Sequence, residues 1–231
     1  MRAACWALTA SLFLGFFTAR QSGATSPLQP GFFMEYRVES FSEGRRSEER
    51  FRLVVREDLG ADRRLLELSL DSGGAYRAVY QTAAGAAGPF ALERFERVEG
   101  REDGKWQSLV PADIELLAQL AEMQDRVERS QPVADSTLTL AGRAWHARRY
   151  ALADSSEAVQ RSASVTLTRQ VLAQGTAWVA DDLPFGGWLR FEEQRRARKI
   201  SEIGGRRYVG AEETSRELWT LVALSAAAPN K

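Results

Sequence analysis

The sequence has almost none of the side chains on which thiol and zinc sites depend. Its 231 residues include one cysteine, Cys5, and one histidine, His146. Structural zinc sites need about four cysteine and histidine ligands, and triad catalysis needs an imidazole with positioned partners. Cys5 stands so near the start that we expect no disulfide or thiolate ligand in the mature chain. The composition therefore predicts no metal and no cofactor.

The chain also lacks an excess of either charge. Lys and Arg total 31 and Asp and Glu total 31; without residues 1–24, which contain Arg2 and Arg20, 29 basic residues face 31 acidic ones. A net charge of about −2 predicts no nucleic-acid partner, because domains that neutralise phosphates carry a clustered basic excess. The basic cluster at residues 195–199 is interpreted as a solvated stripe, with an acidic partner or a membrane surface as the alternative.

The longest apolar run is too short to cross a bilayer. It covers residues 3–17, about fifteen positions where a spanning helix needs roughly 20. Arg2 precedes the run, and Ser22-Gly23-Ala24 supplies the small-x-small pattern that signal peptidase reads. We therefore expect residues 1–24 to be a cleaved signal peptide. The mature chain should then have no stable membrane span and lie in the periplasm or be secreted.

Motifs of the common enzyme classes are missing as well. No Gly-x-Ser-x-Gly elbow, phosphate-binding glycine loop or two-histidine helix motif occurs. Carboxylate pairs such as Glu192-Glu193 are expected to be mostly solvated, since neighbours on a strand point to opposite faces and cannot share a substrate bond. His146 could act only as a lone general base without an identifiable partner. The sequence favours a protein that is not an enzyme.

The sequence does contain regular alternation of apolar and polar residues, which is typical of half-buried strands. It is clearest from Phe32 to Val38. Short turns separate the segments and favour antiparallel pairing, because parallel strands need long crossovers. Strands are expected at residues 32–38, 51–55, 66–71, 76–80, 90–98, 136–140, 144–152, 163–172, 176–180 and 188–192, with 218–224 as strand or helix.

One helix is expected at about residues 111–128. Pro111 suits a first helical turn because its missing N–H is not needed there. An apolar stripe follows at helical spacing, formed by Leu116, Leu120, Met123 and Val127. Residues 25–231 are therefore predicted to form a single domain of the mainly-β or α+β class. Its curved, half-barrel-like antiparallel sheet should have about nine to eleven strands, with this helix packed on one face.

Residues 178–188 have the most distinctive local sequence, W-V-A-D-D-L-P-F-G-G-W. One interpretation is a hairpin connection whose glycines take unusual backbone angles and whose tryptophans fill the core. The other is a binding site in which the aromatic residues line the mouth of an apolar pocket and the aspartates hold a cation or a polar ligand group. On that second interpretation the ligand-binding residues are Trp178, Asp181, Asp182, Phe185 and Trp188.

This order of features resembles the bacterial exported half-barrel proteins that act as periplasmic lipoprotein carriers and receptors. The signal peptide, the long meander and the interposed helix carry the likeness over most of the chain, and residues 178–192 carry it in sequence. The resemblance implies an apolar concavity under a helix, no catalytic residue, and reversible binding of acyl chains.

We therefore expect non-enzymatic binding of a lipid, a lipoprotein or another apolar ligand in the cell envelope. Two alternatives stay open. One is an envelope scaffold that binds another protein through a sheet edge, and the other is a hydrolase that uses carboxylates around Asp181 and Asp182.

Overall fold

The computed structural model describes residues 28–82, 90–162, 164–185 and 187–225. The signal peptide expected at residues 1–24 lies outside this part. The strands are β1 (Phe33–Ser42), β2 (Arg45–Gly60), β3 (Arg63–Leu70), β4 (Ala75–Gln81), β5 (Phe95–Glu102), β6 (Lys105–Leu109), β7 (Pro132–Leu140), β8 (Arg143–Arg161), β9 (Val165–Val179), β10 (Trp188–Ile203) and β11 (Arg206–Leu224). The helical elements are α1 (Glu115–Arg129) and two 3-10 turns, η1 (Leu92–Arg94) and η2 (Pro111–Asp113).

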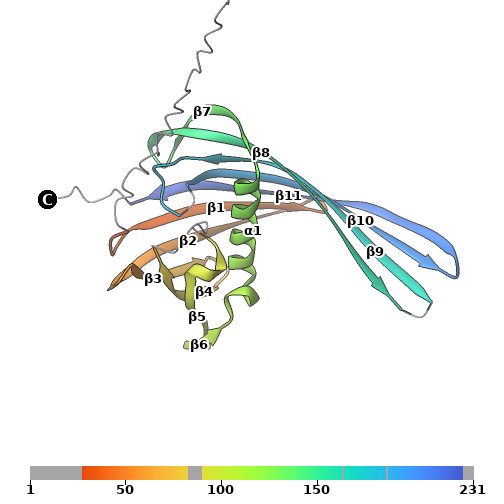
Figure 1. Ribbon diagram of the computed structural model, residues 1–231, viewed down its shortest axis with the longest axis horizontal. Helices are drawn as coiled ribbons and strands as arrows, with labels where there is room; N and C mark the ends of the chain where they lie inside the picture. The colour runs from red at the N-terminus through yellow and green to blue at the C-terminus, as the bar shows by residue number, and fades with distance from the viewer. Residues whose placement is uncertain (1–27, 83–89, 163, 186, 226–231) are drawn as a thin grey trace, which may run out of the picture.

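The strands form one sheet of eleven in the order β6-β5-β4-β3-β2-β1-β11-β10-β9-β8-β7. Strands β1 to β6 make one antiparallel meander, β7 to β11 make a second, and the two join where β1 pairs with β11. The sheet is curved but not closed, because β6 and β7 lie at opposite edges (Figure 1). The predicted fold, mainly β with a broad antiparallel sheet and one helix, is confirmed.

Helix α1 connects the two edge strands and therefore crosses the concave face of the sheet (Figure 1). The predicted apolar stripe faces inward, since Leu116, Leu120, Met123 and Val127 are all buried. The helix begins at Glu115 rather than at residue 111. Residues 111–113 form a separate 3-10 turn because the next residue, Ile114, is extended and buried in the core.

The core lies between α1 and the concave face. Strand register places one residue from each of five neighbouring strands in a row, and all five are buried: Val38, Trp219, Phe191, Ala177 and Tyr150. Fully burying a large apolar side chain contributes about 1.5–3 kcal/mol. With no cysteine among residues 28–225, such packing stabilises the fold without disulfides.

Beyond the core, the sheet continues as a projecting arm (Figure 1). We define the arm as residues 151–161 of β8, 165–174 of β9, 194–203 of β10 and 206–214 of β11. Strand β7 pairs with β8 only as far as Tyr150, and β1 pairs with β11 only as far as Ser215, so both edges of the arm are open. The predicted strands 144–152 and 163–172 reach into the arm, but its parts in β10 and β11 were not predicted, because about half of their residues are charged.

Strand β9 shows why a glycine misled the prediction. Residues 163–172 and 176–180 were expected to be two strands, but β9 runs unbroken from Val165 to Val179. A Cβ on Gly175 would lie 2.4 Å from the carbonyl oxygen of Glu192. The glycine therefore permits a close approach of β10 and does not end the strand.

One further segment differs from the sequence prediction, and one open alternative is resolved. Within residues 90–98, a 3-10 turn comes first and the strand starts only at Phe95. The segment 218–224, left open between strand and helix, belongs to β11. In the described ranges, no helix combines the length and the apolar character needed to cross a membrane.

Candidate functional site

The segment between β9 and β10 is a hairpin connection, as one of the two interpretations predicted. Val179 pairs with Trp188, and the N–H of Ala180 donates to the carbonyl of Gly187 at 2.7 Å. Gly187 has a φ of +65°, and a Cβ there would lie 2.2 Å from the carbonyl oxygen of Ala180. Glycine is therefore required at this position of the turn.

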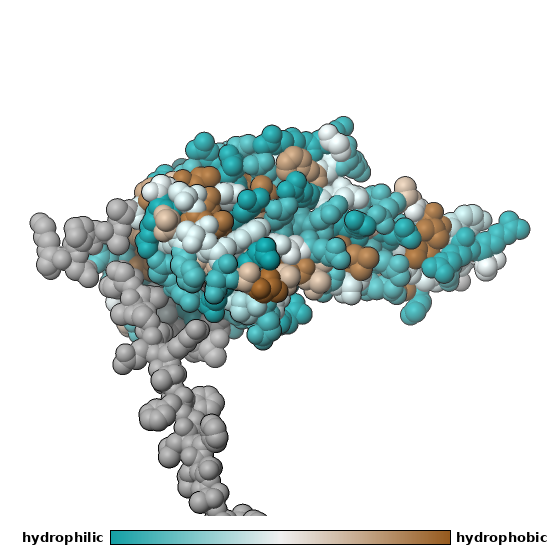
Figure 2. Space-filling view, turned by 90° about the horizontal axis from the view of Figure 1, so that it is seen from above, coloured by the Kyte–Doolittle hydropathy of each residue, from teal (hydrophilic) through white to brown (hydrophobic). Residues whose placement is uncertain are grey.

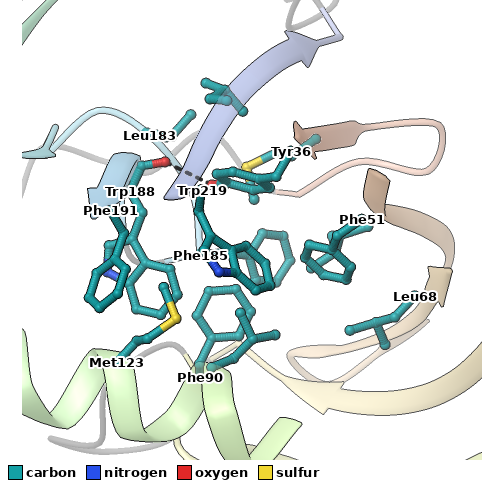
Figure 3. Close-up of a cluster of buried hydrophobic side chains, with 14 of the residues drawn as sticks. Tyr36, Phe51, Leu68, Phe90, Met123, Leu183, Phe185, Trp188, Phe191 and Trp219 are labelled. Carbon is teal, nitrogen blue, oxygen red and sulfur yellow. Dashed lines mark hydrogen bonds between the residues drawn. The ribbon is translucent and has the colours of Figure 1, made fainter. Parts of the chain in front are cut away.

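Two of the five candidate residues, Phe185 and Trp188, lie in the aromatic cluster beneath α1 (Figure 3). They are 4% and 3% exposed. The ring centroid of Phe185 lies 5.3 Å from that of Tyr80, and Phe90 lies 5.1 Å from Trp188. Phe185 has a φ of 53°, in a left-handed region that bulky residues rarely adopt. Burial of its ring offsets the cost of that backbone angle.

Asp181 and Asp182 stay at the surface, and each carboxylate is paired with an arginine of β8. Asp181 bonds to Arg148, and Asp182 lies 2.5 Å from Arg143. Exposed ion pairs of this kind contribute about 0–1 kcal/mol. The structure therefore separates the aspartates from the buried aromatic cluster and links them to the neighbouring strand.

Trp178 and His146 lie outside the buried cluster. Trp178 is half-buried at the margin of the core, with the guanidinium of Arg190 at 5.2 Å from its ring centroid. His146 is exposed on β8, opposite Thr137 in the register. Among the described residues, the side chain of His146 has no hydrogen bond or ion pair, so no partner orients it as a base.

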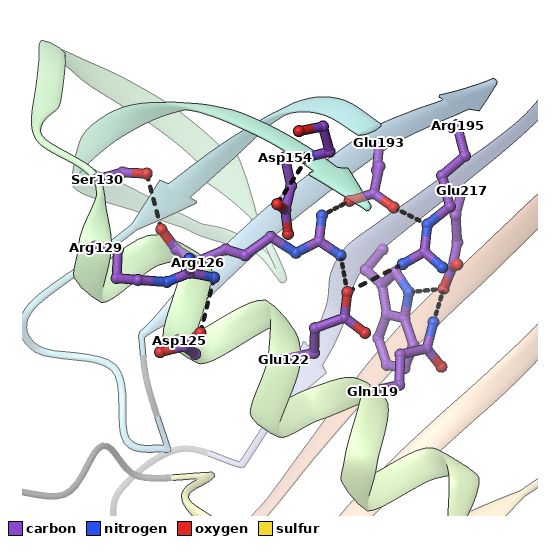
Figure 4. A network of polar contacts seen from close by, with 12 residues as sticks. Gln119, Glu122, Asp125, Arg126, Arg129, Ser130, Asp154, Glu193, Arg195 and Glu217 are labelled. Atoms are coloured by element: carbon purple, nitrogen blue, oxygen red, sulfur yellow. Dashed lines mark hydrogen bonds and ion pairs between the residues drawn. The ribbon is translucent and has the colours of Figure 1, made fainter. Parts of the chain in front are cut away.

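A polar network also holds α1 to the sheet (Figure 4). Arg126 of α1 pairs with Glu193 of β10 and, at 2.7 Å, with Glu122 of its own helix. Arg195 binds the other oxygen of Glu193 and reaches Glu122 at 3.8 Å. The side chains of Arg126 and Glu193 are 5% and 2% exposed. The centre of the network is thus an ion pair buried between helix and sheet.

A second polar contact lies further along α1. The amide nitrogen of Gln119 donates to Oε1 of Glu217 at 2.6 Å, and the indole N–H of Trp219 donates to the same oxygen. Two buried polar atoms of α1, Nε of Arg126 and Oε1 of Gln124, have no partner among the described residues. The contact between α1 and the sheet is therefore partly polar and incompletely satisfied.

Burial and neighbouring charge shift the pKa values of groups around the site. Burial raises the pKa of Tyr36, whose hydroxyl donates to the carbonyl of Trp188 at 2.8 Å. For Arg195, burial lowers the pKa, but the hydrogen bond to Glu193 and the nearby carboxylates outweigh it, and the net shift is upward. Tyr36 therefore stays neutral as a hydrogen-bond donor, and Arg195 stays a cation.

A hollow of about 400 Å³ adjoins the network, between α1 and the arm. Small residues such as Ala173, Ala197 and Ser215 lie among its lining residues, together with charged ones. Arg169 and Asp154 line it without an ion-pair partner in the described part of the chain. The hollow is polar, in contrast to the aromatic cluster on the other side of the network.

The sequence analysis missed the buried ion pair, although each partner left a signal. Strand alternation places Glu193 on the same face as Phe191, so the expectation that such carboxylates are solvated is wrong for Glu193. On the helix, Arg126 comes three positions after Met123 and therefore lies along the apolar stripe. The hollow left no such signal, because its residues come from six separate segments.

Compared with known proteins, the chain matches no family model and no curated protein. The geometry of the helix-covered face is therefore the basis for a functional conclusion.

Proposed function

We propose that the protein binds a lipid, or the acyl chains of a lipidated partner, between α1 and the concave face of the sheet, without catalysing a reaction. One observation carries this proposal: a single helix covers the aromatic face of a sheet that does not close. An apolar ligand needs a concave apolar wall and a route of entry. The sheet supplies the wall, and α1 acts as the cover. The site of action is the bacterial cell envelope, reached through the expected signal peptide.

The polar network makes α1 a cover that can be lifted. When α1 moves away, the charges of Arg126 and Glu193 regain water, which returns much of the free energy lost by burying them. An interface of purely apolar side chains has no such compensation on opening. The buried ion pair therefore lowers the cost of moving the helix while keeping one closed position.

The aromatic cluster is the surface that the ligand would contact. In this structure the side chains of Phe90, Phe185 and Trp188 fill the space under α1 (Figure 3). An acyl chain enters when α1 moves outward and these side chains contact the ligand in place of the helix. The surface carboxylates Asp181 and Asp182, each engaged by an arginine, add no support to a hydrolase.

Locking α1 to the sheet tests the proposal. In a Cys5→Ser background, Gln119→Cys and Glu217→Cys place two thiols where the native side chains touch, and a short bis-maleimide reagent joins them. The free protein should bind a dibrominated fatty acid, measured as quenching of tryptophan fluorescence. The crosslinked protein should bind it at least about ten-fold more weakly, because each 1.4 kcal/mol of opening cost is a factor of ten.

A matched control uses a contact within the sheet. Arg56 and Glu67 are joined at 2.7 Å, similar to the 2.6 Å contact of Gln119 with Glu217. The crosslinked Arg56→Cys/Glu67→Cys variant should bind the fatty acid as the free protein does. The proposal fails if the free protein does not bind the probe, or if locking α1 leaves binding unchanged.

The open edges of the arm favour a second candidate function, an adaptor that pairs a strand of another envelope protein. Beyond Tyr150, β8 pairs only with β9 and presents unpaired backbone groups to solvent. The N–H of Ser155 donates to its neighbour Asp154 at 2.8 Å, which indicates that this N–H points outward from the ladder. An extended segment of a partner can add to such an edge.

A proline at the open edge tests the adaptor function. Ser155→Pro should remove an outward N–H and block strand addition while leaving the pairing with β9 intact. Crosslinking in the envelope should then lose a specific protein partner that the unchanged chain captures. An unchanged partner set, with circular dichroism showing an intact fold, contradicts strand addition at this edge.

A further inference from the structure

We propose that the end of the arm docks onto the surface of an anionic lipid bilayer. We define the arm tip as the described residues in 158–168 and 200–209. These residues lie beyond α1 and beyond the last pairing of β1 and β7 with the arm (Figure 1). The inference is independent of ligand binding under α1.

The first support is a concentration of exposed apolar side chains at the arm tip. Of the ten large apolar side chains exposed among the described residues, five lie there, each 43% to 55% exposed. Apolar patches are also visible along the arm in the space-filling view (Figure 2). The five residues are Val159, Leu167, Ile203, Tyr208 and Val209. Clustered exposure of this kind marks an interaction surface.

The second support is that both faces of the arm tip are apolar. Leu167 and Tyr208 both pair with Ser201 and therefore share one face. Val209 pairs with Ile200, which lies on the opposite face because neighbours on a strand alternate. A protein partner packed on one face would leave the other face in water. A lipid interface surrounds the arm tip and covers both faces.

The third support is charge. The arm tip has three arginines, Arg161, Arg206 and Arg207, and one acidic residue, Glu202. The three arginines are exposed and have no ion pair within the described ranges. The arm tip is thus basic, whereas residues 25–231 as a whole are slightly acidic. Basic residues beside exposed apolar and tyrosine side chains suit an anionic headgroup layer.

The open edges of the arm set the depth of contact. Unpaired backbone N–H and C=O groups cannot enter the hydrocarbon core without a large cost. From Ile200 to Ile203 the strand advances about 10 Å, which matches the roughly 5–10 Å to which interfacial elements enter a membrane. Docking therefore involves the headgroup region and the first part of the acyl layer, with the two edges still hydrated.

Vesicle flotation of the exported protein tests this docking. The unchanged protein should float with vesicles containing phosphatidylglycerol and much less with pure phosphatidylcholine. Leu167→Ser/Ile203→Ser/Tyr208→Ser should weaken binding at least about ten-fold, since each side chain loses apolar contact. The control Leu109→Ser/Val110→Ser/Val133→Ser alters side chains that are 39%, 59% and 54% exposed elsewhere and should leave binding unchanged.

The charges are tested separately. Arg161→Gln/Arg206→Gln/Arg207→Gln should also reduce binding about ten-fold or more and remove its sensitivity to salt. Arg45→Gln/Arg101→Gln/Arg149→Gln, at exposed positions away from the arm tip, should not. The protein with α1 crosslinked should still bind vesicles, which separates docking from ligand uptake. Equal flotation with both lipids, equal loss in the control variants, or capture of a protein in place of lipid through the arm tip overturns the proposal.

Discussion

Glu193→Gln should lower the free energy of unfolding by about 3 kcal/mol. The substitution keeps the shape of the side chain but removes the charge opposite Arg126, whose side chain is 5% exposed. Breaking a buried pair from one side is costly because the remaining charge is left in a poorly solvated place. Glu122 still pairs with Arg126 at 2.7 Å, but its own side chain is 52% exposed and largely hydrated, so this pair offsets little of the loss. Urea unfolding followed by circular dichroism measures the change.

Two further variants show whether burial of the ion pair causes this effect. Glu213→Gln removes an exposed partner of Lys199, at 3.0 Å, and should change stability by about 0–1 kcal/mol. Arg126→Met/Glu193→Leu removes both buried charges and should recover most of the stability lost in the single variant. If the double variant is as unstable as Glu193→Gln, the network stabilises the protein in some other way.

The same double variant bears on the proposed function. With apolar side chains in place of the ion pair, moving α1 exposes apolar surface and no charge regains water. The variant should therefore be stable but bind the brominated fatty acid more weakly than the unchanged protein. The double variant would then be more stable than Glu193→Gln and yet bind the fatty acid more weakly than the unchanged protein.

Phe185→Ala should cost about 3–5 kcal/mol of stability, the range for removing a buried aromatic ring. The ring lies within 5.3 Å of Tyr80 and 6.1 Å of Phe90, measured between centroids, so its removal leaves a hole in the centre of the cluster. The left-handed backbone at residue 185 also loses the packing that offsets its cost. Chemical unfolding of the variant measures the loss.

The aspartates of the same connection provide the comparison. Asp181→Asn/Asp182→Asn removes two surface ion pairs with arginines of β8 and should change stability by less than about 1 kcal/mol. A large loss in the double aspartate variant, with little loss in Phe185→Ala, would show that the carboxylates rather than the buried ring hold the connection in place.

The sequence by itself determined the class of the fold. Alternation between polar and apolar residues with short turns can be satisfied only by antiparallel strands, and the stripe from Leu116 to Val127 only by a helix with one buried face. Both patterns are local, so they can be read without knowing which segments meet. The hairpin between β9 and β10 follows in the same way, from glycines between two apolar runs.

Only the tertiary structure decided how these elements meet. The pairing of β1 with β11 joins the two meanders and places α1 across the concave face. It brings together residues far apart in the chain: Phe33, for example, contacts Ser225, 192 positions later. The same arrangement brings Glu193 and Arg126 together; local pattern places each on an inward face but does not show that the two meet. It also leaves the polar strands of the arm paired but uncovered. These features depend on contacts between segments far apart in the chain, and no local periodicity encodes such contacts.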